Sequence, residues 1–361
     1  MIFKQMQRFV IAGAVIAALS ACSGGRGASG GGTISGAGST FAAPLYTKWA
    51  SAYDQAGSGK INYQAIGSGG GIKQIKSKTV DFGASDKPLK LAELNEAGLM
   101  QFPTAIGGIV PVINLGGIKS NDVKLTGQIL GDIFLGNIKT WNAPELTALN
   151  PSLKLPATPI TVVHRSDGSG TTFQFASFLA SASPDWKSKV GISDSLAWPV
   201  GLGGKGNDGV AAFVKQTAGS IGFVEYAFAK QNKLTTALVR NRDGLFPAPT
   251  AASFSAAAAN APWDKSEGNY LVLVDQTGKD SWPITGVTFV LMRKVPADAV
   301  KSAAVLRFFD WAFANGNALA AKIDYIPLPD AVKTMVRGQW SQIQANGKPV
   351  YTPKSQTQSG T

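Results

Sequence analysis

The chain has 361 residues, of which 44% are hydrophobic and 16% charged, so it can bury a large core in two lobes and is not a disordered protein. Its net charge of +12 comes from scattered Lys and Arg residues without long runs, which argues against a nucleic-acid-binding surface. One histidine and one cysteine are too few for a zinc site or an intrachain disulfide, so we expect neither.

The N-terminal residues have the pattern of an export signal. Residues 1–21 combine a basic start, an apolar stretch and small residues, as in a secretory signal peptide. The motif LSAC, which ends at Cys22, resembles the lipobox of bacterial lipoproteins, whose cysteine receives a lipid. A stray thiol inside a cleaved peptide is the alternative. We therefore interpret residues 22–32 as the lipidated cysteine followed by a flexible Gly/Ser tether.

Short apolar runs then alternate with helical patterns, which indicates a mixed α/β protein. In chain order, the first predicted elements are a strand starting at Thr33, a helix after the turn 36–41, a strand at 61–66, a helix after the glycine turn 67–71, and a strand at 80–86. Two long apolar stretches, 103–115 and 281–294, predict buried strands. Because they are far apart in sequence, we expect them to cross between two lobes.

The C-terminal part predicts two helices and a tail. In the first helix, over 298–316, Val300, Ala304, Phe308 and Trp311 are expected on one side. The second covers 329–340. The last residues have no apolar content and predict a loose tail at 353–361.

One pattern occurs three times: a hydroxyl residue among glycines, immediately before a helix. It appears as GAGST with Thr40, as GSGGG with Ser68, and as GSGTT with Ser169. The first turn of a helix has unpaired N–H groups and a partial positive charge, so it stabilises an anion. Each instance alone could be a helix cap. Together with Arg165, the three favour a site that holds an anion through many donors.

Catalysis by Ser169 would need a base, and His164 is the only histidine. If 160–165 is a strand, His164 and Arg165 point to opposite faces. Asp167 and Thr171 occupy the outer glycine positions of a G-x-S-x-G motif, so that motif is absent. The stretch GGKGND at 203–208 lacks the end of a Walker A motif and predicts a glycine turn before a helix at 210–215. We therefore expect no enzyme and no catalytic residue.

Two aspartates are informative. Asp86 either caps a helix after Pro88 or accepts a hydrogen bond from an anion that carries a proton. Phosphate keeps a proton near neutral pH and sulfate does not, so Asp86 would favour phosphate. Asp167 lies two positions after Arg165 and can hold its guanidinium from the same side of an extended chain, with a surface salt bridge as the alternative.

Five long motifs carry a resemblance to a known family. They are GAGSTFAAPLYTKW, YQAIGSGGGIKQI, VDFGASDKPL, RSDGSGTTF and WPVGLGGKGNDGVAAFV. From residue 34 to residue 351, the chain resembles the periplasmic phosphate-binding proteins of bacterial high-affinity phosphate ABC transporters. The resemblance implies an α/β, two-lobed periplasmic binding protein fold of type II-like topology. Each lobe would be a mixed sheet flanked by helices, with two hinge crossings. Lobe 1 would hold 33–108 and 284–352, and lobe 2 would hold 109–283.

The resemblance also implies the site. Its phosphate-binding residues would be Thr40, Phe41 through its backbone N–H, Ser68, Asp86, Arg165, Ser169, Gly170 and Thr171, with Asp167 steadying the arginine. Small departures are Gly69, where relatives often have serine, and His164, where another basic residue can stand.

The implied function is binding of inorganic phosphate and its delivery to an ABC permease in the inner membrane. We expect a monomer without a cofactor, in the periplasm or cell envelope. Its anchoring through Cys22 is expected from LSAC and is the larger departure, since many Gram-negative relatives are free in the periplasm while Gram-positive ones are lipoproteins. The alternatives are a phosphomonoesterase that uses Ser169 and a binding protein for another oxyanion such as sulfate.

Overall fold

The computed structural model describes residues 32–259 and 261–353. The helices are α1 Ala43–Gln55, α2 Ser68–Lys76, α3 Leu91–Glu96, α4 Gly127–Leu135, α5 Pro144–Leu149, α6 Gly170–Ala182, α7 Pro184–Lys189, α8 Gly206–Gln216, α9 Tyr226–Gln231, α10 Ala251–Ala259, α11 Ala299–Asn315, α12 Asn317–Ala321 and α13 Asp330–Gln339. Three short 3₁₀ helices are Trp263–Lys265, Glu267–Asn269 and Trp340–Gln342.

The strands are β1 Ile34–Gly38, β2 Ile61–Ala65, β3 Phe82–Ser85, β4 Leu99–Ile113, β5 Lys124–Leu125, β6 Thr161–Arg165, β7 Leu202–Gly204, β8 Ser220–Glu225, β9 Thr235–Thr236, β10 Leu238–Val239, β11 Thr285–Arg293, β12 Ile326–Pro327, β13 Gln344–Ala345 and β14 Lys348–Pro349. Within the described residues, ten of them form one mixed sheet with the central order β2-β1-β3-β11-β4-β8-β6-β7. The strands β1, β2 and β3 are parallel neighbours, as are β6, β7 and β8 around β6.

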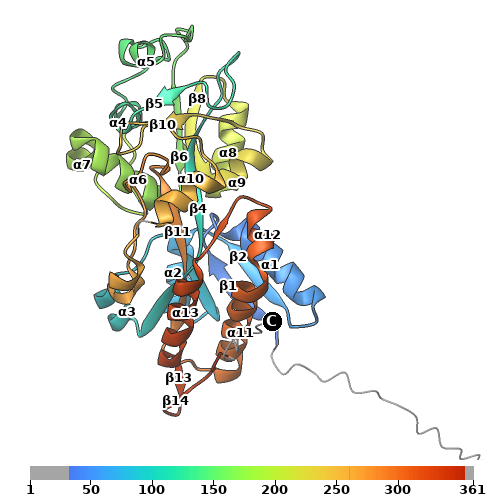
Figure 1. Cartoon of the computed structure of the whole chain (residues 1–361). Coiled ribbons are helices and arrows are strands. Elements are labelled where there is room, and N and C mark those ends of the chain that lie inside the picture. The colour runs from blue at the N-terminus through green and yellow to red at the C-terminus, as the bar shows by residue number, and fades with distance from the viewer. Residues whose placement is uncertain (1–31, 260, 354–361) are drawn as a thin grey trace, which may run out of the picture. The chain divides into compact units, whose positions relative to one another are not determined.

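Strand β4 connects the two ends of this sheet (Figure 1). Its segment 99–108 pairs antiparallel with β11, whereas its last residues, 109–113, pair with β8. All fifteen residues of β4 are buried, as are eight of the nine in β11. The two long strands predicted from apolar stretches are therefore present, with somewhat different bounds. A register shift opposite Thr288 and Phe289 marks a bulge in β4, where Thr104 is the extra residue between Pro103 and Ala105.

Helices α1 and α11 cover the β1–β3 end of the sheet and share its core (Figure 1). In α1, Leu45, Trp49 and Tyr53 are buried at the predicted spacing of four residues. The predicted side of α11 is buried at Ala304 and Phe308, but the prediction is wrong at Val300, which lies in the first turn and is 56% exposed. Its buried side also includes Val305 and its neighbours further along the helix.

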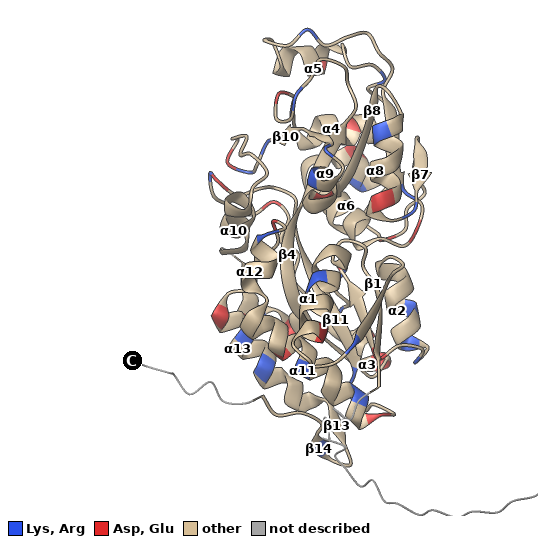
Figure 2. Ribbon diagram, turned by 90° about the vertical axis from the view of Figure 1, so that its right-hand side faces the viewer, with Lys and Arg blue, Asp and Glu red and all other residues tan. Residues whose placement is uncertain are grey.

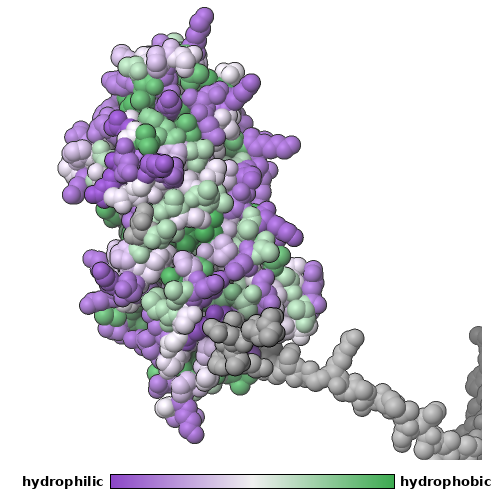
Figure 3. Space-filling view, viewed as in Figure 1, coloured by the Kyte–Doolittle hydropathy of each residue, from purple (hydrophilic) through white to green (hydrophobic). Residues whose placement is uncertain are grey.

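Charged residues of both signs are distributed along the elements at both ends of the sheet (Figure 2). On the face shown in Figure 3, polar and apolar side chains are intermixed. Among the described helices, none combines the length and the apolar character that crossing a membrane requires.

Candidate functional site

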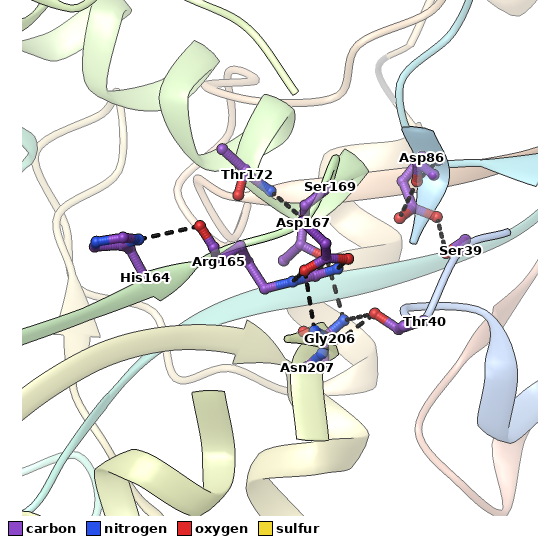
Figure 4. Close-up of polar contacts among 12 residues, drawn as sticks. Ser39, Thr40, Asp86, His164, Arg165, Asp167, Ser169, Thr172, Gly206 and Asn207 are labelled. Carbon is purple, nitrogen blue, oxygen red and sulfur yellow. Dashed lines mark hydrogen bonds and ion pairs between the residues drawn. The ribbon is translucent and has the colours of Figure 1, made fainter. Parts of the chain in front are cut away.

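The predicted site residues lie where strands end. Because β1, β2 and β3 are parallel, their carboxyl ends meet at one edge of the sheet. The turn 39–41 follows β1, Ser68 begins α2 shortly after β2, and Asp86 directly follows β3. From the other end of the sheet, Arg165 is the last residue of β6, and Ser169 precedes α6. Figure 4 shows these two groups facing each other.

Asp86 is a fully enclosed carboxylate, with an exposed fraction of 1%. Its Oδ1 accepts hydrogen bonds from the hydroxyls of Ser39 and Thr288, both at 2.6 Å, and its Oδ2 accepts a longer one from Ser68 at 3.3 Å. Burial raises the pKa of Asp86 to about 6, although these hydrogen bonds and the charge of Arg165 lower it. Oδ1 is thus well supplied with donors, whereas Oδ2 has room to accept a stronger hydrogen bond.

Asp86 does not cap the helix that follows it. Helix α3 begins at Leu91, and its N-cap position is Lys90, whose backbone N–H donates to the carboxylate of Glu93. The capping alternative for Asp86 is therefore wrong. Its carboxylate instead accepts hydrogen bonds from Ser39 after β1, from Ser68 at the start of α2 and from Thr288 in β11.

Arg165 is buried and held by Asp167 in a two-point ion pair. Its Nε donates to Asp167 Oδ1 at 2.8 Å and its Nη2 donates to Oδ2 at 2.6 Å. Burial alone would raise the pKa of Asp167, but the hydrogen bonds and charge of Arg165, with the N–H of Gly206, lower it. The guanidinium is therefore fixed in plane, with Nη1 at 3.4 Å from the hydroxyl of Thr171.

Ser169 is both the N-cap of α6 and a potential donor. Its Oγ accepts a hydrogen bond from the backbone N–H of Thr172 at 3.0 Å, so its own proton can be directed elsewhere. The next two residues, Gly170 and Thr171, are in the first turn, where N–H groups have no acceptor within the helix. This end of α6 can therefore supply several donors to an anion.

The turn after β1 is fixed from both sides. The Thr40 hydroxyl oxygen accepts hydrogen bonds from the backbone N–H of Asn207 at 3.2 Å and from its side-chain Nδ2 at 2.8 Å. The hydroxyl of Tyr325 donates to the carbonyl of Phe41, and the two rings pack edge to face with centroids 6.1 Å apart. Both Thr40 and Phe41 are buried.

The two groups of turns are in direct contact. The backbone N–H of Gly69 donates to the carbonyl of Gly168 at 2.9 Å. The side chain of Gln174, in α6, donates to the Asp86 carbonyl at 2.7 Å. Beside them, Lys87 Nζ lies 2.8 Å from Asp194 Oδ1 in a partly buried ion pair. The structure therefore brings the residues predicted from the two ends of the sheet together around one small volume.

Asn207 belongs to this constellation, although no sequence pattern singled it out. Helix α8 begins at Gly206, four residues before the predicted start, so GGKGND is more than a turn. Asn207 is fully buried and contacts Thr40 and also Thr171, whose hydroxyl oxygen lies 3.2 Å from Nδ2. The sequence pattern concerned hydroxyl residues before helices, whereas Asn207 is an amide residue inside the first turn of α8.

His164 points away from the site, as the strand alternation predicts (Figure 4). Its ring stacks on Trp198, with centroids 4.7 Å apart, and its Nδ1 lies 3.0 Å from the Arg165 carbonyl oxygen. Burial lowers the pKa of His164. None of its described hydrogen bonds reaches Ser169, so the histidine is not arranged as a base for that hydroxyl.

Chemically, the arrangement offers one permanent positive charge, several hydroxyl and N–H donors, and one buried acceptor, Asp86. This combination suits an oxyanion that carries at least one proton. A cleft of about 680 Å³ between α1, α9 and α12 contains none of the predicted site residues. Cys22 and the predicted tail beyond Pro353 lie outside the described residues.

Comparisons with known proteins give a consistent picture. A family model described as PBP superfamily domain matches residues 25–315. The phosphate-binding protein PstS of Xylella fastidiosa (strain 9a5c) is 51% identical over 308 residues, which cover 85% of each chain. PstS of Haemophilus influenzae is also 51% identical over 308 residues, which cover 85% of this chain and 92% of the relative.

Among solved structures, the high-affinity periplasmic phosphate-binding protein PfluDING, bound with phosphate, superposes with a TM-score of 0.68. The match covers 85% of this chain and 94% of PfluDING. At 24% identity, this likeness concerns the fold alone.

Proposed function

The chain belongs to the family of the phosphate-binding proteins PstS, within the PBP superfamily, and on this premise we propose that it binds inorganic phosphate for import by an ABC permease. The observation that carries the proposal is the buried carboxylate of Asp86 opposite the guanidinium of Arg165 and the start of α6. A site made of donors alone would suit any oxyanion. An ionised acceptor among them selects an anion that brings its own proton.

In this proposal each end of the sheet contributes half of the ligand shell. Residues 33–108 and 284–352 form lobe 1, which supplies Thr40, the N–H of Phe41, Ser68 and Asp86. Residues 109–283 form lobe 2, which supplies Arg165, Ser169, Gly170 and Thr171, with Asp167 holding the guanidinium. The contacts between Gly69 and Gly168 and between Lys87 and Asp194 support a closed arrangement. Opening would separate these contacts and release the ligand to the permease.

Titration calorimetry of the purified protein with phosphate and with sulfate tests this function. We expect tight, saturable binding of one phosphate and no detectable binding of sulfate near neutral pH. A protein that binds sulfate as tightly as phosphate would contradict the role of Asp86, and a protein that binds neither would contradict the function itself.

A phosphomonoesterase that uses Ser169 is the rival from another class. The proposal of a non-enzymatic protein is supported by the position of His164, which leaves Ser169 without a base, and by the N-cap role of the Ser169 hydroxyl. Release of p-nitrophenol from its phosphate ester is the discriminating assay. Turnover that disappears in Ser169→Ala would establish the rival function.

We further propose that the protein acts as a monomer in the periplasm or cell envelope, anchored by a lipid on Cys22. The motif LSAC and the Gly/Ser-rich stretch after it support this anchoring. The partner would be the phosphate ABC permease in the inner membrane. Metabolic labelling with a radioactive fatty acid, compared between the natural chain and Cys22→Ser, tests the lipid; equal labelling of both would exclude Cys22.

A further inference from the structure

We propose that Asn207 is a positioning residue that makes the hydroxyls of Thr40 and Thr171 act as donors toward the bound anion. This inference rests on the proposed function, because it concerns the same site. Asn207 is the second residue of α8 and is fully buried between the turn after β1 and the start of α6 (Figure 4). It thus contacts one hydroxyl from each half of the site.

The orientation of the Asn207 amide is fixed by a partner that can only donate. Its Oδ1 accepts a hydrogen bond from the backbone N–H of Glu225 at 2.9 Å. The oxygen must therefore lie on that side, and Nδ2 must point toward the two threonines. The assignment of nitrogen and oxygen follows from chemistry because a reversed amide would place two donors against each other.

The direction of the Thr40 hydroxyl then follows. Its Oγ1 accepts from the backbone N–H of Asn207 at 3.2 Å and from Nδ2 at 2.8 Å. A hydroxyl oxygen has two lone pairs, and both are engaged. The proton of Thr40 is therefore the group that remains to bind a ligand.

Thr171 has the same arrangement. Its Oγ1 lies 3.2 Å from Asn207 Nδ2 and 3.4 Å from Arg165 Nη1, and both of these atoms are donors. Its proton is thus also directed away from these two donors. The hydroxyls of Ser39 and Thr288 behave in the opposite way, because their protons are already given to Asp86.

This polarity has a functional consequence. When a ligand binds a hydroxyl that can rotate freely, fixing that rotation costs conformational entropy and weakens binding. A hydroxyl whose proton is already directed at the ligand does not have this cost. Asn207 sets one donor in each half of the site. It would therefore raise affinity for the anion without touching it.

The test is a double-mutant cycle on the full mature protein, with phosphate affinity measured by calorimetry. We expect Asn207→Ala to weaken phosphate binding roughly ten-fold, the loss of about one hydrogen bond. In a Thr40→Val background the same change should weaken binding only about three-fold or less, because the hydroxyl through which Asn207 acts is missing. Asn150→Ala is the matched control, since Asn150 is a buried asparagine that bonds Lys124 and Leu146. It should leave phosphate affinity unchanged.

An unchanged affinity in Asn207→Ala, or an equal loss with and without the Thr40 hydroxyl, would overturn the inference. Failure of the unmodified protein to bind phosphate would instead overturn the proposed function. If Asn207→Ala does not fold, neutron diffraction of the unmodified phosphate complex replaces it. We expect the Thr40 deuterium to point at phosphate; a deuterium directed at Asn207 would contradict the assignment.

Discussion

Gly170 packs against Asp86 so closely that a methyl group on Gly170 would lie 2.6 Å from the Asp86 Cβ. The same methyl group would lie 2.6 Å from Ser68 Oγ. Real Cβ atoms essentially never come this close to a neighbour, so something would have to move. The contact joins residues from opposite ends of the sheet, and a glycine is required for them to meet.

Gly170→Ala should therefore keep the two ends apart while leaving each intact. We expect phosphate affinity to fall at least ten-fold, roughly the cost of losing one good hydrogen bond or more, with little change in the melting temperature. Calorimetry and thermal unfolding check the two parts. Gly338→Ala is the matched control, since its new methyl group would have no atom within 4 Å. Equal affinities for all three proteins would show that the close contact is unimportant for binding.

Arg165 is the second test. It is the buried cation of the site, so Arg165→Ala should cost about 2–5 kcal/mol of phosphate binding energy. Arg165→Lys keeps the charge but loses the two-point pair with Asp167, and it should cost less. A dissociation constant that stays the same in Arg165→Ala would remove the arginine from the proposed site.

Asp86 should control selectivity in a pH-dependent way. Its pKa of about 6 means that above this pH the carboxylate is ionised and accepts a hydrogen bond from phosphate, whereas below it the carboxyl is protonated and can donate a hydrogen bond to sulfate. Discrimination against sulfate should therefore weaken as the pH falls from about 8 to about 5. Competition binding with both anions at several pH values measures this.

Asp86→Asn is the control for that pH series. The amide Oδ1 can still accept from Ser39 and Thr288, while its Nδ2 becomes a donor at every pH. We expect discrimination to drop by at least a factor of about 100 near neutral pH and to vary little with pH. A variant that still ignores sulfate would place the selectivity elsewhere in the site.

Glu225 gives a stability prediction. It is fully buried, and burial raises its pKa to about 8, although a hydrogen bond from the Ala227 N–H lowers it. The folded state therefore binds more protons than the unfolded state between the usual pKa of a glutamate and about 8. Its contribution to the free energy of unfolding is fully present at acidic pH and is lost as the pH rises through that range.

Glu225→Gln mimics the protonated carboxyl and should remove this dependence. Relative to the natural protein, the free energy of unfolding of the variant should rise by on the order of 2 kcal/mol between about pH 6 and pH 9. Urea unfolding at several pH values measures the difference. Glu96→Gln, at an exposed position, should show no such trend, and parallel curves for Glu225→Gln would contradict a neutral Glu225.

Much of the fold followed from local patterns. The α/β fold class of a periplasmic binding protein is confirmed by the family model and by the superposition on PfluDING. It was predictable because long apolar stretches and helical spacings are strong signals. In α11 the prediction was right for Ala304 and Phe308 and wrong for Val300, since a spacing of four residues does not say at which turn of the helix the core begins. Only the packing of Val305 and its neighbours decides that.

Side-chain contacts of the candidate site were predictable where the two contacting residues are also close together in the sequence. Arg165 and Asp167 are such a pair, and Ser169 caps the helix that directly follows it. Thr288 and Asn207 could not be found in this way. Thr288 reaches Asp86 across 202 positions in the sequence, and Asn207 reaches Thr40 across 167. Such contacts depend on the arrangement of the whole sheet, which no local pattern contains.

The place of β11 in the sheet also bears on the order in which the protein takes shape during synthesis. This strand lies between β3 and β4 in the sheet. In the chain, however, it comes after both of them and after the segment that contains β5 to β10. A growing chain thus makes β6, β7 and β8 before β3 can be joined to β4. We expect the half formed by the single segment 109–283 to assemble first. The half formed by 33–108 and 284–352 must wait until β11 has been made. Thr288, which donates to Asp86, arrives with that last strand.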